Sequence, residues 1–208
     1  MSGSTVPWRT TTHEWSRAVD GDHLASIRQH PARYSPGGVL HLILEVLAYA
    51  ADEAQHHRAA RCRVTLHADG SIAVSDDGRG TDTRIDDHAR LVRKPVMATR
   101  DLRFFDVSDA PLLPDGHPRR GMSVVAALSE CLVLTNRRRD GAWTQRYVHG
   151  IPVTALVPIP DDDTTGTTVR FRPGEGLSTL TATSIHELGR SARSWSHLIV
   201  EINDQRAE

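Results

Sequence analysis

The sequence predicts an α+β fold, a two-layer sandwich in which one mainly antiparallel sheet carries helices on one face. Two observations lead to this prediction. A strongly apolar helix, expected over 39–55, precedes two short alternating segments joined by Asp69-Gly70, a dipeptide typical of hairpin turns. Later in the chain, several strand-like segments follow one another without helices between them. Grouped helices and strands favour a sandwich over an alternating parallel sheet.

The first part of the chain divides into an arm and a helix. Residues 1–20 are polar and lack a clear period, so we expect an arm or flexible extension there and the folded domain over 21–208. The helix is expected because apolar side chains recur at steps of three and four and form one stripe. This stripe consists of Leu40, Leu44, Leu47, Ala51 and Ala54.

The second part begins with a long irregular segment. Residues 81–120 are rich in Asp, Arg and Pro, which predicts a long ordered loop or a lid. Residues 121–130 form an apolar run entered through Gly121, and we expect a short helix there. Strands are expected at 131–138, 144–150, 151–159 and 167–173, followed by a helix at 181–195 and a last strand at 197–204.

Size and charge narrow the class of protein. A chain of 208 residues can form one good core, and a formal net charge of −1 does not favour a surface that coats nucleic acid. We therefore infer no direct DNA binding. No apolar run is long enough to span a membrane, and residues 1–15 lack the apolar core of a signal peptide. These features predict a cytoplasmic domain without a membrane partner.

Three local patterns could carry chemistry. Glu45, Tyr49 and Asp52 share one face of the expected helix. From spacing alone, a solvated charge on an amphipathic helix is the favoured explanation of Glu45.

The second pattern is SDDGRG, residues 75–80, at the end of a strand. A carboxylate such as Asp76 can accept a hydrogen bond from an exocyclic amine, and Gly78 and Gly80 would leave room for a flat ring. An ordinary Asp-Asp-Gly turn is the alternative.

The third pattern is GHPRRGMSVV, residues 116–125. Gly121 stands at the expected start of a helix, where free N–H groups attract phosphate oxygens, and Arg119 and Arg120 add positive charge. A plain loop-to-helix transition with solvated arginines is the alternative. A further segment, GTTVRF at 166–171, is a strand with threonines at its start.

Taken together and in this order, these segments resemble the ATP-binding domain of the gyrase B protein. That domain belongs to a family shared by gyrase, a heat-shock chaperone, sensor histidine kinases and a mismatch-repair protein. The resemblance extends from about Ile27 to Gln205. LHLILEVLAYAADEA is similar to the first motif, LHADGSIAVSDDGRG to the second, GMSVVAALS to the glycine-loop helix and GTTVRF to the last motif. The resemblance implies the gyrase-B-type fold and binding of ATP or ADP.

The resemblance also implies roles for individual residues. Glu45 corresponds to the general base that orients water toward the γ-phosphate, and Asp76 to the carboxylate that recognises the adenine amino group. The other matched positions are Thr167, whose hydroxyl would assist Asp76, Gly80 beneath the adenine, Arg79 beside the adenine pocket, Asp52 in the first motif and Gly121 as the last glycine of the phosphate loop.

The chain departs from the family at its metal and phosphate positions. Tyr49 stands where the family holds magnesium through an asparagine, and a phenol is a poor ligand for this ion. We therefore assign no metal ligand, and Mg²⁺ is in question. Pro118, Arg119 and Arg120 replace small loop residues, so that any phosphate contact would come from the arginine side chains.

Two functions remain open from the sequence. The first is ATP binding by a free-standing gyrase-B-like domain that hydrolyses ATP weakly or only with a partner. It would not be a complete topoisomerase. The second is a non-catalytic nucleotide sensor or protein-interaction module with a degenerate ATP site. Either a homodimer or another protein could be the partner.

Overall fold

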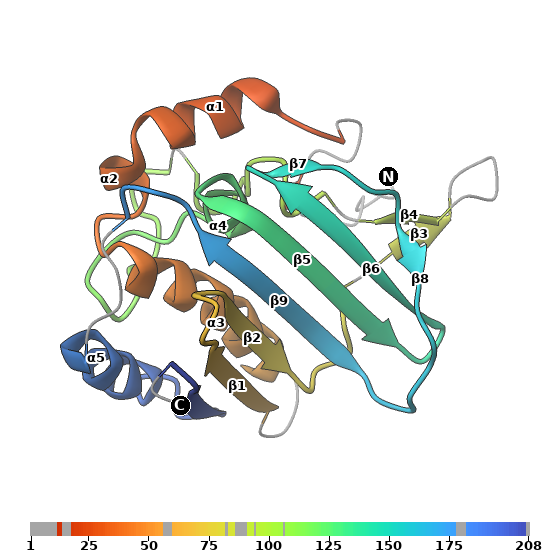
Figure 1. The fold of residues 1–208 in the computed structure, drawn as a ribbon. Helices are drawn as coiled ribbons and strands as arrows, with labels where there is room; N and C mark the ends of the chain where they lie inside the picture. Colours follow the sequence, from red (N-terminus) through yellow and green to blue (C-terminus); the bar gives the residue numbers. More distant parts are fainter. Residues whose placement is uncertain are drawn as a thin grey trace, which may run out of the picture.

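The computed structural model describes residues 12–13, 18–55, 60–81, 83–85, 91–93, 95–105, 107–177 and 182–206. It confirms the α+β prediction. In Figure 1 one broad, mainly antiparallel sheet is seen face on, with α3 behind it. The helices among the described residues are α1 (Gly21–Gln29), α2 (Pro31–Tyr34), α3 (Val39–Gln55), α4 (Met122–Ala127) and α5 (Ala182–Ala192).

The main sheet has eight strands in the order β10-β1-β2-β9-β5-β6-β7, with β8 also paired to β6. β10 runs parallel to β1, and the other pairs of this sheet are antiparallel. The strands are β1 (Ala60–Leu66), β2 (Ile72–Asp76), β5 (Ser129–Arg138), β6 (Gly141–Val148), β7 (Ile151–Pro152), β8 (Val157–Pro158), β9 (Gly166–Pro173) and β10 (Leu198–Asp204). A separate two-stranded sheet pairs β3 (Thr83–Ile85) with β4 (Leu91–Arg93).

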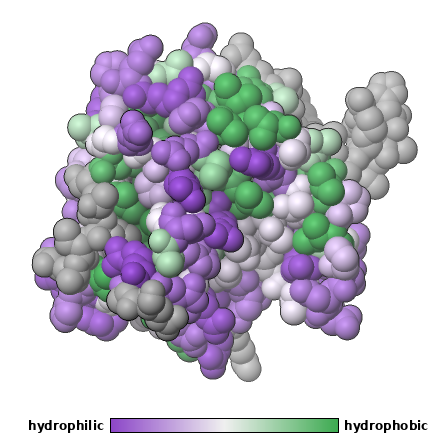
Figure 2. Space-filling model, in the orientation of Figure 1, coloured by the Kyte–Doolittle hydropathy of each residue, from purple (hydrophilic) through white to green (hydrophobic). Residues whose placement is uncertain are grey.

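The core lies between the sheet and α3. Four members of the predicted stripe are buried and Leu40 is half-buried. Because the loop 95–121 covers the side of α3 that the sheet leaves open, the polar side chains of His41 and Glu45 are also fully buried. The face of the sheet turned toward the viewer in Figure 2 is largely hydrophilic, as expected for the uncovered side of a two-layer sandwich.

The hairpin of β1 and β2 confirms the prediction from Asp69-Gly70. Val64 pairs with Val74, and the backbone N–H of Gly70 donates to the carbonyl oxygen of His67 at 3.0 Å. This hairpin fixes Asp76 at the end of β2, beside the start of β9.

The structure differs from the predicted elements in several places, among them the strands β3 and β4 in the segment 81–120, where a loop or lid was predicted. Helices α1 and α2 were not predicted, although Asp20 caps α1 by accepting from the backbone N–H of His23 at 3.1 Å. The strand expected at 151–159 is split into two-residue pieces, β7 and β8, each of which contains a proline that cannot donate to a ladder. The helix expected at 121–130 ends early, because Ser129 begins β5.

The predicted arm, 1–20, lies mostly outside the described residues and stays a prediction. Within the predicted lid, the described residues include β3 and β4, and Asp101, Arg119 and Arg120 contact α3. None of the described helices combines the length and the apolar character that a membrane crossing needs.

Candidate nucleotide site

A cavity of about 190 Å³ opens between α3, the ends of β2 and β9, and the segment 79–81. Its walls are largely apolar, formed by Val46, Val74, Met97, Met122, Leu134 and Val169. Asp76 and Thr167 supply polar groups at one side, and Tyr49 borders the cavity at another. A flat apolar ring with one polar edge suits such a cavity.

Asp76 is held in place by two backbone donors. Its Oδ1 accepts from the N–H of Gly78 at 2.9 Å and from the N–H of Thr167 at 3.3 Å. Burial raises the pKa of Asp76 to about 6, against these two hydrogen bonds, which lower it. No described residue hydrogen-bonds Oδ2, so this oxygen can accept from a ligand. Thr167 thus contacts Asp76 through its backbone N–H, and the role predicted for its hydroxyl, directly or through water, stays a prediction.

The segment after Asp76 follows the edge of the cavity. Gly80 has a φ of +80°, and a Cβ there would come within 2.5 Å of the carbonyl oxygen of Arg137, so glycine is required. Asn136 fixes the next residue, because its Oδ1 accepts from the Thr81 N–H at 2.6 Å and its Nδ2 donates to the Thr81 carbonyl at 3.0 Å. Arg79 pairs with Glu53 at 2.7 Å near the surface. Asn136 was missed from the sequence.

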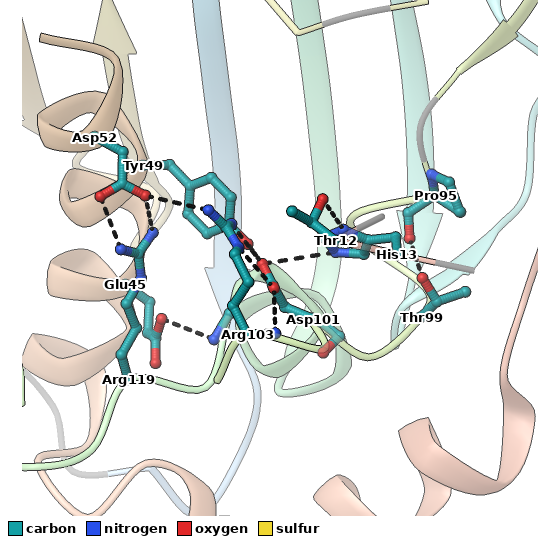
Figure 3. Close-up of polar contacts among 12 residues, drawn as sticks. Thr12, His13, Glu45, Tyr49, Asp52, Pro95, Thr99, Asp101, Arg103 and Arg119 are labelled. Carbon is teal, nitrogen blue, oxygen red and sulfur yellow. Dashed lines mark hydrogen bonds and ion pairs between the residues drawn. The ribbon is translucent and has the colours of Figure 1, made fainter. Parts of the chain in front are cut away.

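Glu45 caps the turn into α4. Its Oε1 accepts from the backbone N–H of Arg120 at 2.5 Å, and its Oε2 accepts from the N–H of Gly121 at 2.9 Å. Figure 3 shows Glu45 on the same helix face as Tyr49 and Asp52, turned toward the loop that carries Arg119. The carboxylate expected as a general base thus occupies the N–H groups expected to bind phosphate.

His41 connects Glu45 to the same loop and was also missed from the sequence. Its Nδ1 lies 2.6 Å from Asp115 Oδ2, and its Nε2 lies 3.5 Å from Glu45 Oε1. Burial alone would lower the pKa of His41, but its contacts with Asp115 and Glu45 outweigh burial and raise the pKa to about 9. His41 is therefore cationic at neutral pH and stabilises the buried Glu45 carboxylate.

Tyr49 points toward Asp101 and Arg103 in the loop (Figure 3). Its hydroxyl donates to Asp101 Oδ2 at 2.5 Å. Burial, together with the charge of Asp101, raises the pKa of Tyr49 well above its usual value of 10, so the phenol stays neutral. Asp101 also accepts from Arg103 Nε at 3.0 Å and from Arg103 Nη2 at 2.7 Å.

Arg119 forms a second bidentate pair on the same helix face. Its Nη1 and Nη2 donate to the two carboxylate oxygens of Asp52 at 3.0 and 2.8 Å. Its guanidinium also lies over the Tyr49 ring at 4.7 Å and over the Phe104 ring at 4.1 Å. Arg103 lies 4.5 Å from the centre of the same Phe104 ring. We call Glu45, Tyr49, Asp52, Asp101, Arg103, Phe104 and Arg119 the lid cluster.

Gly121 allows the loop to pack closely against Tyr49 and Asp101 in the lid cluster. It has a φ of +100°, and a Cβ would lie 3.0 Å from the Asp101 Cβ and 3.4 Å from the Tyr49 hydroxyl oxygen. The glycine matched to a phosphate loop is therefore needed here for packing the loop against α3.

The described residues do not fit a magnesium site. They contain no group of three or more His, Cys, Asp or Glu side chains arranged to hold a metal ion. Magnesium needs compact oxygen ligands in octahedral geometry, whereas the Tyr49 hydroxyl donates its proton to Asp101 and both Asp52 oxygens accept from Arg119.

Comparisons with known proteins agree with this fold. No family model matches the chain. It is 33% identical over 167 residues to the chloroplastic/mitochondrial DNA gyrase B protein of Nicotiana benthamiana, covering 75% of this chain and 23% of that protein. It is 37% identical over 155 residues to the DNA gyrase B protein of Thermotoga maritima, covering 72% of this chain and 24% of that protein. The chain thus spans about a quarter of the length of these relatives.

A solved structure shows the same architecture. The topoisomerase IV ATP-binding domain of Francisella tularensis, in complex with a small-molecule inhibitor, matches with a TM-score of 0.67 and 23% identity over 88% of this chain and 90% of that one. Sequence and fold together place the chain in the gyrase-B-type ATPase domain family.

Proposed function

We propose that this domain binds adenine nucleotides through the cavity beside Asp76. One observation carries the proposal: a carboxylate fixed by two backbone N–H groups leaves one oxygen for a ligand at the side of an apolar cavity. An adenine ring has the matching chemistry, because it is flat and carries an exocyclic amine. The printed name of the related solved domain, an ATP-binding domain, supports the same ligand class.

Hydrolysis of ATP by this site would be weak or would depend on a partner. Phosphoryl transfer relies on positioning and on stabilisation of charge. Glu45, the proposed general base, is engaged by two backbone N–H groups, and the proposed phosphate contact Arg119 is engaged by Asp52. Efficient turnover therefore requires the lid cluster to rearrange.

A second candidate, a non-catalytic nucleotide sensor, is favoured by the way the loop is held. Glu45, Tyr49 and Asp52 hold 101–121 to α3 by separate contacts, so ligand binding beside them could be transmitted to the loop. A homodimer or another protein would then read the state of the loop. We also propose a cytoplasmic location, and one folded domain over 21–208 preceded by an arm.

Calorimetric titration of ATP and ADP into the wild type and Asp76→Ala tests the proposal. We expect 1:1 binding by the wild type and a loss of about 10- to 150-fold in Asp76→Ala, the range for removing a hydrogen bond to a charged group. Asp77→Asn is the matched control, because Asp77 is the exposed neighbour and lies outside the cavity lining. Equal affinity in the wild type and Asp76→Ala would exclude the site, and a steady-state assay on the wild type would measure turnover.

A further inference from the structure

We propose that the cavity accepts adenine as a nucleoside or free base, and that neither phosphate groups nor Mg²⁺ add to its affinity. This inference rests on the proposed function, since it concerns the ligand class of the same site. A bound triphosphate would need backbone donors, cationic side chains, net positive charge and a metal ion. The contacts of the lid cluster occupy or remove each of these four features.

The backbone donors are already used. The N–H groups of Arg120 and Gly121, at the start of α4, donate to the two oxygens of Glu45 at 2.5 and 2.9 Å. Glu45 is fully buried. A phosphate that took over these N–H groups would leave a buried carboxylate without its two donors, which is costly. Glu45 therefore acts as a resident anion at this position.

Two guanidinium donors of each arginine are used as well, whereas the buried Arg119 Nε has no hydrogen-bond partner among the described residues. Arg119 is 6% exposed and forms two hydrogen bonds with Asp52. Arg103 forms two with Asp101. Because paired fork geometry is the strongest arrangement that an arginine makes with a carboxylate, a phosphate would compete against optimal partners in both cases. Phe104 lies beneath both guanidiniums and holds their planes in place.

The local charge does not attract a phosphate. Within the lid cluster three carboxylates, Glu45, Asp52 and Asp101, face two guanidiniums, Arg103 and Arg119, which gives a net charge of −1. His41 and Asp115 pair with one another and add no net charge. The Arg120 side chain is partly exposed and has no ion-pair partner among the described residues, and it brings the sum only to zero. A triphosphate carries several negative charges and would find no excess of positive charge.

Magnesium does not fit this site either. A metal ion would normally offset phosphate charge, but Tyr49 presents a neutral phenol whose proton is donated to Asp101. The cavity itself, at about 190 Å³, is smaller than the roughly 300–1,000 Å³ of pockets for drug-sized ligands. Its size suits a base ring, and its polar side at Asp76 suits an exocyclic amine. The adenine half of a nucleotide site is therefore present while the phosphate half is filled by protein.

Calorimetric titration of adenine, adenosine, AMP, ADP and ATP into the wild-type chain, each with and without Mg²⁺, tests the inference. We expect adenosine to bind at least as tightly as ATP, with less than a threefold change on adding Mg²⁺. Asp76→Asn should weaken adenosine binding at least tenfold, which would assign adenosine to this cavity, whereas Asp77→Asn should leave it unchanged.

The failures of the two proposals can be told apart. Binding of ATP with Mg²⁺ ten times more tightly than adenosine, lost in Asp76→Asn, would overturn the inference and leave adenine-nucleotide binding intact. Absence of binding by every compound in the series would overturn both proposals. Adenosine binding that is unchanged in Asp76→Asn would also overturn both, because the ligand would then lie elsewhere.

Discussion

At the scale of single residues, Asp76 and Glu45 show how one side-chain type takes two roles. Both are carboxylates that accept two backbone N–H groups. Asp76 accepts both hydrogen bonds on one oxygen and leaves the other for a ligand. Glu45 uses one oxygen for each donor and lies fully buried, so it is built into the fold. Glu45 therefore caps α4, and the free oxygen of Asp76 supports the proposal that this residue recognises the ligand.

The raised pKa of Asp76 predicts a pH dependence of ligand binding. Because Oδ1 accepts from two backbone N–H groups, a proton added to Asp76 would lie on Oδ2 and turn the oxygen that faces the ligand into a hydroxyl donor. Binding should therefore be full above the pKa of about 6 and weaken by about tenfold for each unit of pH below it. Asp77 and Glu53, the nearby acidic groups, contribute to the raised value. Adenosine affinity measured from pH 5 to 8 checks this, and a flat profile would rule out an ionised Asp76 as the acceptor.

Replacement of Asp76 by a neutral isostere is expected to stabilise the fold. The pKa of Asp76 is higher in the folded chain than its usual 3.8, so the folded state gains a proton relative to the unfolded state between about pH 4 and 6. Stability is lost as pH rises through this window and stays lower above it. Asp76→Asn should therefore raise the free energy of unfolding at pH 7.5 by about 1–3 kcal/mol. Urea denaturation measures this free energy, with Asp77→Asn as the control. An Asp76→Asn variant less stable than the wild type would contradict the prediction.

At the scale of elements, α3 and the loop 95–121 act as one unit. The lid cluster joins them through Glu45, Tyr49 and Asp52, at successive turns of α3. The bounds of α3 and the β1–β2 hairpin were predictable, because local periodicity and turn chemistry determine them. The partners Asp101, Arg103 and Phe104 were not, because they lie about fifty residues away in a segment without a period.

Loss of the Glu45 carboxylate should destabilise the protein. Glu45→Ala would leave the Arg120 and Gly121 N–H groups without their partner and would remove an anion beside the cationic His41. We expect a loss of about 2–4 kcal/mol in the free energy of unfolding. Chemical denaturation of the wild type and Glu45→Ala at pH 7.5 measures this difference in the free energy of unfolding. A variant as stable as the wild type would instead favour a free carboxylate poised for catalysis.

The hydroxyl of Tyr49 can be tested separately from its ring. Tyr49→Phe keeps the ring beneath Arg119 and removes only the donor to the buried Asp101. Arg103 Nη2 still donates to the same Asp101 oxygen, so we expect the free energy of unfolding to fall by about 1.5–3 kcal/mol, the contribution of one hydrogen bond to a charged group. We also expect faster amide hydrogen exchange across the described part of 101–121. Unchanged exchange in this loop would show that the Tyr49–Asp101 hydrogen bond does not hold the lid.

At the scale of the whole molecule, the fold is more predictable than the state of the site. The order of helix, hairpin, loop, helix and strands identifies the sandwich, and motif order places Asp76 and Gly80 at one cavity. Whether the opposite half of the cavity is open depends on contacts between segments far apart in sequence. In the sequence, Tyr49 and Pro118-Arg119-Arg120 indicated that the metal and phosphate positions differ from those of the family. Only the three-dimensional contacts show that Arg119 pairs with Asp52, a carboxylate of the chain itself.

The most direct test is a crystal structure of the domain grown with excess ATP and Mg²⁺. We expect an adenine ring with its amino group within hydrogen-bond distance of Asp76 Oδ2. We also expect that Glu45 still accepts from the Arg120 and Gly121 N–H groups and that the Arg119–Asp52 pair persists. Ordered phosphates on the start of α4, with Glu45 turned away and a metal ion beside them, would contradict these expectations.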